Sequence, residues 1–263
     1  MNRVAFEVLG HPIYWYGVMF VLGILAGVWS GSLRARLTQV SPKEFQDSIP
    51  WIVGGALIGA RALFVITYWD EYFAREPLWE IFAIQRGGLI YFGGLLFSIV
   101  TTAFYLVKNK IPVWIFLDIL GPSLAVGHAL GRLGCFINGC CYGCPTGSAF
   151  GFSYPDWHET RGTHIHPVQL YEMGLNLILF GLLEYFFRRR KYDGQITACY
   201  LVGYGVIRFT TEFFRGDVPH LFLSLTQAQC IAGVIFAAGV GLWIYRRGSW
   251  ENGKSGNSSK NGK

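Results

Sequence analysis

The sequence predicts an all-α, polytopic membrane protein with seven transmembrane helices, its N-terminus out and its C-terminus in the cytoplasm. Hydrophobic residues make up 52% of the 263 residues and charged residues only 14%, whereas a soluble domain usually carries about 25% charged residues. Apolar runs of about 20 residues, the length that crosses a bilayer, account for most of the chain. They cover residues 14–34, 49–69, 88–107, 112–137, 168–187, 195–214 and 226–245.

The chain is expected to form one transmembrane domain, residues 1–247, followed by a short polar tail. The first apolar run is too long for a secretory signal peptide and is poorly supplied with a basic leader or a small-residue cleavage site. We therefore expect it to stay as a permanent helix. Residues 248–263, GSWENGKSGNSSKNGK, carry no hydrophobic period. Because such a segment cannot bury a core, the sequence predicts a disordered cytoplasmic tail.

The placement of the basic residues sets the expected orientation. Most of the 22 Lys and Arg residues follow the first, third, fifth and seventh apolar runs, and basic residues concentrate on the cytoplasmic side of membrane proteins. The net charge of +6 therefore indicates topology and contact with anionic membrane lipid, and no nucleic-acid partner is expected. The segments expected on the outer side hold Arg3, Arg75, Arg86, Arg161 and Arg215.

Three arginines lie within apolar runs, where a charged side chain is costly. Arg61, Arg132 and Arg208 fall in the second, fourth and sixth runs. An arginine at the centre of a membrane helix costs about 2.5–3.5 kcal/mol on insertion scales. In the expected topology all three lie in the outer half of the bilayer. Each of these arginines either has a structural explanation, such as snorkelling or an ion pair, or lines a functional polar interior. Their shared depth in the bilayer favours the functional polar interior.

The spacing of polar residues strengthens this reading. Tyr204, Arg208 and Glu212 recur every four residues and form one stripe of the sixth helix. His128 and Arg132 stand one turn apart on the fourth helix. Glu212 either pairs with Arg208 or takes part in chemistry. Because guanidinium binds two phosphate oxygens at once, clustered arginines suit the phosphate of a phospholipid headgroup.

Four cysteines follow in the stretch GRLGCFINGCCYGCP, residues 131–145. A structural zinc site usually pairs two short loops that each carry C-x2–4-C, and this pattern is absent. A thiol-disulfide exchanger would use Cys141 and Cys144. The other readings are packed small side chains and a disulfide in an oxidising outer compartment. We predict no metal site and no cofactor, although three histidines of the same expected loop offer further ligands: His158, His164 and His166.

The chain resembles the prolipoprotein diacylglyceryl transferase family in six ordered motifs. The resemblance is strongest in GRLGCFINGCCYG, residues 131–143, which follows the family signature of Gly-Arg, Gly, Phe and a final Gly. The others are WYGVMF at 15–20, GARALFVITY at 59–68, RGGLIYFGGLL at 86–96, HPVQLYE at 166–172 and GYGVIRFTTEFFR at 203–215.

The resemblance implies a multi-pass enzyme of the bacterial inner (cytoplasmic) membrane. Its expected substrates are phosphatidylglycerol and a prolipoprotein, whose signal peptide carries a lipobox cysteine. The diacylglyceryl group would pass to the cysteine thiol, forming a thioether and releasing glycerol phosphate. This reaction is the first step of bacterial lipoprotein maturation.

The family's functional positions give the expected site. The resemblance implies that Arg132 binds the phosphate, that Arg208 acts as a second clamp or gate and that Glu212 belongs to the catalytic group. His166 and Gln169 are expected at the mouth of the fifth helix. The substrate-binding positions are Tyr16, Arg61, Arg132, Asn138, Gly143, Glu172 and Tyr204.

This sequence departs from the family pattern at the expected base. Some relatives carry a histidine near the Gly pair of the third helix, where this chain has Tyr91 and Phe92. Two signature positions often held by Asn and Glu are Cys135 and Cys140. His128 is therefore a candidate base; alternatively Arg132 and its neighbours lower the pKa of the incoming thiol without one.

Two other function classes compete with the transferase. A membrane thiol-disulfide redox protein would use the cluster from Cys135 to Cys144. A transporter or lipid-binding scaffold would need a polar path to the inner face, where the sequence offers little beyond Asp118 and Glu184.

Overall fold

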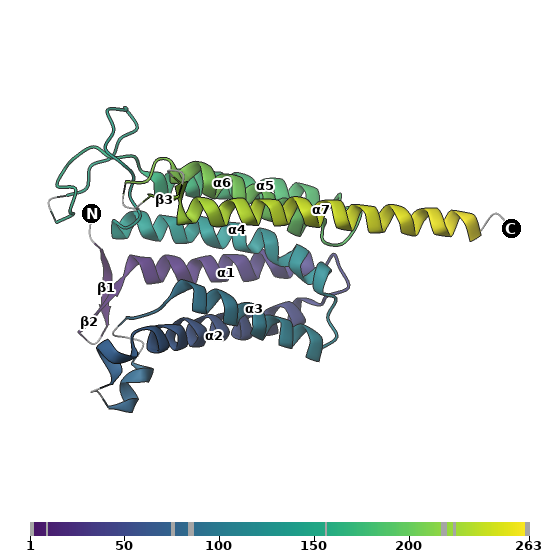
Figure 1. Ribbon diagram of the computed structural model, residues 1–263, viewed down its shortest axis with the longest axis horizontal. Helices are drawn as coiled ribbons and strands as arrows, with labels where there is room; N and C mark the ends of the chain where they lie inside the picture. The colour runs from purple at the N-terminus through teal and green to yellow at the C-terminus, as the bar shows by residue number, and fades with distance from the viewer. Residues whose placement is uncertain are drawn as a thin grey trace. The chain divides into compact units, whose positions relative to one another are not determined.

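Seven long helices dominate the part of the chain that the structure describes. A computed structural model describes residues 3–8, 10–74, 77–83, 87–155, 157–216, 220–222 and 225–260. Each predicted apolar run coincides with a long helix (Figure 1). Arg75, Arg86 and residues 261–263 lie outside the described residues. The helices are α1 (Trp15–Ala35), α2 (Pro42–Thr67), α3 (Tyr91–Lys108), α4 (Val113–Asn138), α5 (Val168–Phe187), α6 (Gln195–Glu212) and α7 (Gln227–Lys260).

Short elements precede or connect these helices. β1 (Val4–Val8) and β2 (His11–Tyr14) pair antiparallel before α1. η1 (Trp69–Phe73) and η2 (Leu78–Phe82) follow α2. β3 (His220–Phe222) and β4 (Leu225–Thr226) form a second antiparallel pair before α7.

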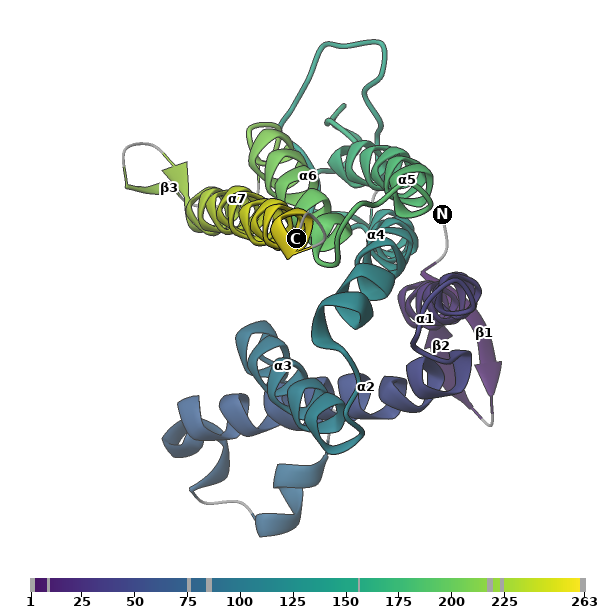
Figure 2. The same ribbon diagram turned by 90° about the vertical axis from the view of Figure 1, so that its right-hand side faces the viewer.

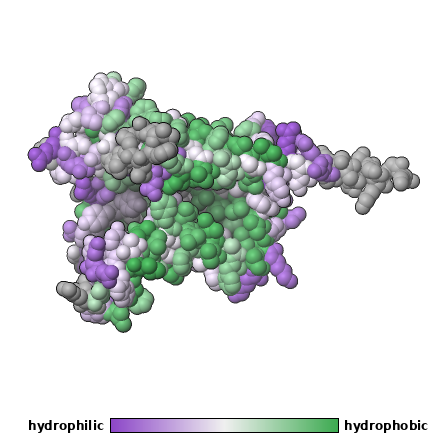
Figure 3. Space-filling model, viewed as in Figure 1, coloured by the Kyte–Doolittle hydropathy of each residue, from purple (hydrophilic) through white to green (hydrophobic). Residues whose placement is uncertain are grey.

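Six of the helices in the described residues are long and apolar enough to cross a membrane: α1 to α5 and residues 227–252 of α7. The chain is therefore a multi-pass membrane protein. On the face shown in Figure 3, apolar residues gather along the helices and hydrophilic residues near their ends. α6 forms where the sequence predicts it, but it carries too many polar side chains to join this set. The seventh span and the orientation of the termini stay predictions.

The chain groups into two compact units, one of which is Ser32–Phe116. Within it, α2 and α3 pack closely because glycines face each other: a Cβ on Gly59 would collide with the backbone oxygen of Gly93. The start of α2 is fixed by a capping box. The backbone N–H of Glu44 donates to the Ser41 hydroxyl at 3.1 Å, and the Ser41 N–H donates to the Glu44 carboxylate at 2.7 Å.

The other unit comprises residues 1–31 and 117–263. In it α1 and α4 approach through glycines, since a Cβ on Gly23 would lie 2.9 Å from the backbone oxygen of Gly127. The Ser123 hydroxyl donates to the Gly27 carbonyl at 2.8 Å across the same contact. α6 packs against both α5 and α7, and Figure 2 shows α6 and α7 side by side.

Asp118 ties α4 to the beginning of α6. Gly194, which precedes α6 and has a φ of 91°, offers no side-chain cap. Instead the fully buried carboxylate of Asp118 accepts hydrogen bonds from the N–H groups of Gly194 and Thr197, both at 2.8 Å, and from the Thr197 hydroxyl at 2.7 Å. These N–H groups are among those that a helix start leaves without a partner. Asp118 thus caps the start of α6. The sequence singles it out only as an isolated polar residue in the cytoplasmic half of a predicted membrane helix.

The C-terminal segment differs from the sequence prediction. The structure continues α7 as helix to Lys260, where the sequence predicts a disordered tail from residue 248. Extending an existing helix adds one hydrogen bond for each residue that is fixed, so a polar segment can follow an apolar helix without a new nucleation step.

Candidate functional site

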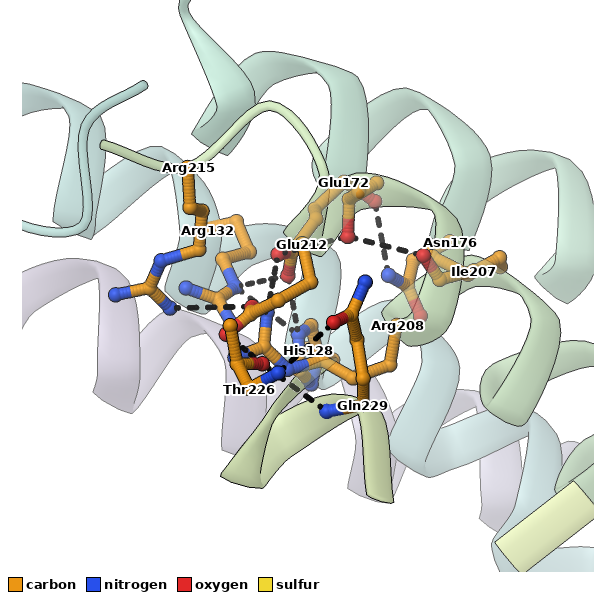
Figure 4. A network of polar contacts seen from close by, with 11 residues as sticks. His128, Arg132, Glu172, Asn176, Ile207, Arg208, Glu212, Arg215, Thr226 and Gln229 are labelled. Carbon is orange, nitrogen blue, oxygen red and sulfur yellow. Dashed lines mark hydrogen bonds and ion pairs between the residues drawn. The ribbon is translucent and has the colours of Figure 1, made fainter. Parts of the chain in front are cut away.

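Glu172 lies at the centre of a polar network that joins three helices. It stands near the start of α5 and is 1% exposed. Its Oε2 atom lies 2.6 Å from Nε of Arg132 on α4, and its Oε1 atom lies 3.0 Å from Nη1 of Arg208 on α6 (Figure 4). The Thr211 hydroxyl on α6 donates to Oε1 at 3.2 Å. One carboxylate therefore holds α4, α5 and α6 together, a central position that the sequence does not predict for Glu172.

His128 joins the same network from α4. Its Nε2 atom lies 3.1 Å from Nε of Arg132 and 3.4 Å from Oε2 of Glu172. Because Nε of Arg132 carries one hydrogen, the imidazole and the carboxylate compete for it, and the shorter contact is to the carboxylate. The imidazole thus lies between a guanidinium and a carboxylate.

A second buried carboxylate, Glu212, completes the network at the end of α6. Its Oε2 atom lies 2.7 Å from Nη1 of Arg208 and 3.9 Å from Nη1 of Arg215. Its Oε1 atom accepts a hydrogen bond of 2.9 Å from the Thr226 hydroxyl. The contact between Arg208 and Glu212 is the one expected from their spacing of four residues. Nη1 of Arg208 therefore lies between two carboxylates.

The network contains more guanidinium than carboxylate groups. Arg132, Arg208 and Arg215 stand against Glu172 and Glu212, which leaves one excess positive charge when the imidazole is neutral. The two carboxylate side chains are 2% and 0% exposed, whereas those of Arg132 and Arg208 are each 14% exposed. Buried carboxylates thus hold the arginines in place, and an incoming ligand meets the arginines first. This arrangement suits an anion.

Two tyrosines flank the network. The Tyr204 ring packs edge-on against His128, with ring centroids 5.4 Å apart, and stacks on Tyr200 at 5.9 Å. Tyr16 stands in the first turn of α1 and is 44% exposed. Gly134 of α4 lies against it, since a Cβ there would be 3.3 Å from the Tyr16 Cα. The sequence-predicted Tyr16 is therefore held beside the helix that carries Arg132.

Asn138 and Gly143 belong to the loop that leaves α4, of which Asn138 is the last helical residue. The Gly143 N–H donates to the His166 carbonyl at 3.0 Å, and a Cβ on Gly143 would lie 2.5 Å from that oxygen. Gly143 is thus required where the loop returns to the start of α5. The buried Gln169 fixes the same loop, because its side-chain amide donates to the Cys140 carbonyl at 2.8 Å.

Three of the four cysteines form a cluster beside this loop. The sulfurs of Cys135, Cys140 and Cys141 all lie within 4.8 Å of one another. Hydrogen bonds from the other two thiols, and the nearby charges of Arg132 and Arg215, lower the pKa of the Cys141 thiol below its ordinary value. Cys144, the expected partner of Cys141 in a redox pair, is not a member of this cluster.

Arg61 makes its contacts within the Ser32–Phe116 unit. Its guanidinium donates to four backbone carbonyls: from Nε to Ile81 at 2.8 Å, from Nη2 to Glu80 at 2.7 Å, and from Nη1 to Gly87 and Gly88 at 2.8 and 3.2 Å. These carbonyls lie in and after η2, so Arg61 holds this connection onto α2. Its role in substrate binding stays a prediction.

Sequence reasoning misses four residues of the network: Thr211, Arg215, Thr226 and Gln229. Thr226 and Gln229 form the capping box of α7, in which the Thr226 N–H donates to the Gln229 side chain at 2.9 Å and the Gln229 N–H donates to the Thr226 hydroxyl at 3.2 Å. The pattern Thr-x-x-Gln before an apolar run is a recognisable sign of such a box. Its further contact with Glu212 depends on the tertiary fold.

Comparison with known proteins agrees with the motifs. The family model described as prolipoprotein diacylglyceryl transferase matches residues 3–245. Relatives named phosphatidylglycerol--prolipoprotein diacylglyceryl transferase include that of Finegoldia magna, 36% identical over 93% of this chain and 95% of the relative. The relative from Bordetella parapertussis is 34% identical over 93% of this chain and 95% of the relative. The relative from Lactobacillus acidophilus is 32% identical over 94% of this chain and 90% of the relative. The chain therefore belongs to the prolipoprotein diacylglyceryl transferase family.

Proposed function

We propose that the chain transfers the diacylglyceryl group of phosphatidylglycerol to the lipobox cysteine thiol of a prolipoprotein, forming a thioether and releasing glycerol phosphate. Family membership supports the transfer, and the relatives are named for these two substrates. The observation that supports this assignment of the active site is the excess of positive charge around Glu172. Arg132 and Arg208 are the partly exposed arginines that carry this charge. The same comparisons favour transfer over thiol-disulfide exchange.

The reaction sets two requirements. The sulfur of a thiolate attacks the glycerol carbon that bears the phosphate ester; a carbon–sulfur bond forms and the carbon–oxygen bond breaks. The electron pair of that bond leaves on the phosphate, so the leaving glycerol phosphate gains a negative charge. The site must therefore stabilise this phosphate and remove a proton from the thiol, because the thiolate is the nucleophile.

Arg132 is the main phosphate-binding residue in this proposal. Among the described residues, its ion pair with Glu172 and its hydrogen bond to His128 both run through Nε. The edge formed by its two Nη groups is then available for two phosphate oxygens. Arg208, held between Glu172 and Glu212, supplies the second positive charge.

The remaining assigned residues position the substrates. Tyr204 packs against His128 and Tyr16 lies against Gly134, both on the helix that carries Arg132, and the two tyrosines offer hydroxyl groups to the headgroup. Asn138 and Gly143 shape the loop beside it, and Arg61 holds the connection after α2.

His128 is the proposed general base. Its imidazole lies 3.4 Å from Glu172, which would stabilise the imidazolium formed when the thiol proton arrives. His128→Gln is expected to lower kcat/KM by about 10²- to 10⁴-fold. An undiminished rate of thioether formation by His128→Gln would instead favour activation of the thiol by the arginines alone.

In the membrane, we infer that α6 is a seventh span and that the N-terminus faces out from the bacterial inner membrane. The basic residues after α1, α3, α5 and α7 support this orientation, and it brings the Glu172 network to the outer half. A reporter that is active only outside the cytoplasm is expected to be inactive when fused after residue 263. An active C-terminal fusion would overturn the orientation.

The proposed function is tested by incubating the purified protein with phosphatidylglycerol and a lipobox peptide. Mass spectrometry should detect the peptide with the added diacylglyceryl group. A peptide with serine in place of the cysteine, and phosphatidylethanolamine in place of phosphatidylglycerol, are the controls. The absence of adduct with the first pair, or equal adduct with the serine peptide, would reject the proposal.

A further inference from the structure

The end of α4 brings two cysteine thiols together through its backbone. The Cys140 N–H donates to the Cys135 carbonyl at 3.1 Å, the Gly139 N–H donates to the Phe136 carbonyl at 3.2 Å, and Gly139 has a φ of 79°. These three features define a Schellman cap, in which the residues at the positions of Cys135 and Cys140 usually make a hydrophobic contact. Here both contact positions hold thiols.

Cys141 completes the cluster through an unfavourable backbone conformation. Its φ of 61° lies in the left-handed region, which a residue with a Cβ adopts at a cost of about 1–3 kcal/mol. In this conformation its sulfur lies within 4.8 Å of those of Cys135 and Cys140. Three thiolates around Zn²⁺, with bonds of about 2.3 Å, stand about 3.8 Å apart. The sulfurs therefore need to approach one another by at most about 1 Å.

The neighbouring histidine is not available as a fourth ligand. His158 donates from Nε2 to the Gly139 carbonyl at 2.7 Å, and its Nδ1 lies 2.8 Å from the Thr160 hydroxyl. Both ring nitrogens thus serve to hold the loop. Within the described part of the chain, the three cysteines are the only group of at least three Cys, His, Asp or Glu side chains placed to share an ion. A metal bound there keeps one position for an outside ligand.

The cluster lies within electrostatic reach of the proposed phosphate site. Cys135 stands three residues, about one turn, after Arg132 on α4, and the positive charges of Arg132 and Arg215 both favour the thiolate of Cys141. Three thiolates and one Zn²⁺ carry one net negative charge, equal in size to the single positive charge that the Glu172 network leaves over. The three cysteines are half-buried rather than enclosed in the core.

We propose that Cys135, Cys140 and Cys141 bind Zn²⁺ as three thiolates and leave its fourth position to the thiol of the prolipoprotein cysteine. A structural zinc site has four protein ligands, whereas a site with three keeps a position for a reactant. A thiol that coordinates Zn²⁺ loses its proton, and His128 accepts it. The bound sulfur then attacks the glycerol carbon that bears the phosphate ester; the carbon–sulfur bond forms, the carbon–oxygen bond breaks and glycerol phosphate leaves with the electron pair. The neutral thioether then leaves the metal. The role of the fourth position rests on the proposed function; the binding of the ion does not.

The first measurement is the zinc content of the purified, reduced protein. About one Zn²⁺ per chain is expected for the wild type and for Cys144→Ser, which removes a thiol of the same loop. Almost none is expected for Cys141→Ser and for the triple Cys135→Ser, Cys140→Ser, Cys141→Ser variant. A wild type that binds no zinc, or that holds Cys135 or Cys140 in a disulfide, would overturn the proposal. Equal zinc in the triple variant would do the same.

The second measurement replaces Zn²⁺ with Co²⁺ and follows the sulfur-to-cobalt absorption. The lipobox peptide should increase this absorption, whereas the peptide with serine should not. No difference between the peptides would overturn the role of the fourth position. The adduct assay separates the two proposals: a zinc-free wild type that still forms adduct at the full rate rejects the metal and keeps the transferase. Zinc binding with a cysteine-dependent cobalt spectrum but no adduct supports the metal and rejects the transferase.

Discussion

Replacing Arg132 with alanine is expected to lower kcat/KM for diacylglyceryl transfer by about 10²- to 10³-fold, the usual loss when one donor to a developing negative charge is removed. The phosphate gains charge as the carbon–oxygen bond breaks, and the accessible edge of Arg132 meets it. The loss should fall mainly on kcat, because the interaction strengthens in the transition state. The rate of thioether formation at increasing concentrations of phosphatidylglycerol separates kcat from KM.

Two further variants make this result specific. Arg132→Lys keeps the charge but loses the planar pair of donors, so it should retain more activity than Arg132→Ala while remaining below wild type. Arg247→Ala removes an arginine whose side chain is 61% exposed and pairs with Glu251 on α7. It should leave the rate unchanged. Equal rates for Arg132→Ala and Arg247→Ala would remove Arg132 from the mechanism.

Replacing Glu172 with alanine is expected to lower the free energy of unfolding by about 3–5 kcal/mol, the range for a buried ion pair that loses one partner. The carboxylate is 2% exposed and faces Arg132 and Arg208. Without it, two guanidinium groups would be left close together with one buried carboxylate, Glu212, near Arg208. Denaturant unfolding in detergent micelles measures the change.

Glu251→Ala is the matched control for this prediction. It removes a carboxylate from an arginine pair at 2.8 Å in which the Glu251 side chain is 52% exposed. An exposed pair of this kind contributes about 0–1 kcal/mol, so this variant should unfold close to wild type. A similar loss of stability in both variants would show that the buried ion pairs of Glu172 contribute no more to the free energy of unfolding than an exposed pair does.

The sequence predicts the helices well because a membrane helix is defined by local composition. The seven predicted runs all coincide with helices, and Arg132, His128, Arg208 and Glu212 can be placed on them by periodicity. The pairing of Arg208 with Glu212 also follows from spacing along one helix, since residues four apart share a face.

The sequence does not predict how the helices meet. Glu172 stands 40 residues after Arg132 and 36 before Arg208, and no local pattern shows that its two oxygens face those two arginines. Asp118 caps α6 from a helix 76 residues earlier in the chain. The cysteine cluster depends on the left-handed backbone of Gly139 and Cys141, which for Cys141 is an exception to its residue type.

The polar side chains of α6 bear on the order in which the helices enter the membrane during synthesis. Among the described residues, α6 is the one long helix that does not reach the apolar composition of a membrane span. Two of its buried contacts are to Asp118 and Glu172. Both partners precede α6 in the sequence, so they have already been synthesised when α6 leaves the ribosome. As the proposed seventh span, α6 would then insert with the help of α4 and α5 rather than of lipid alone. Arg132, Glu172 and Arg208 would thus come together before α7, the next long helix, is inserted.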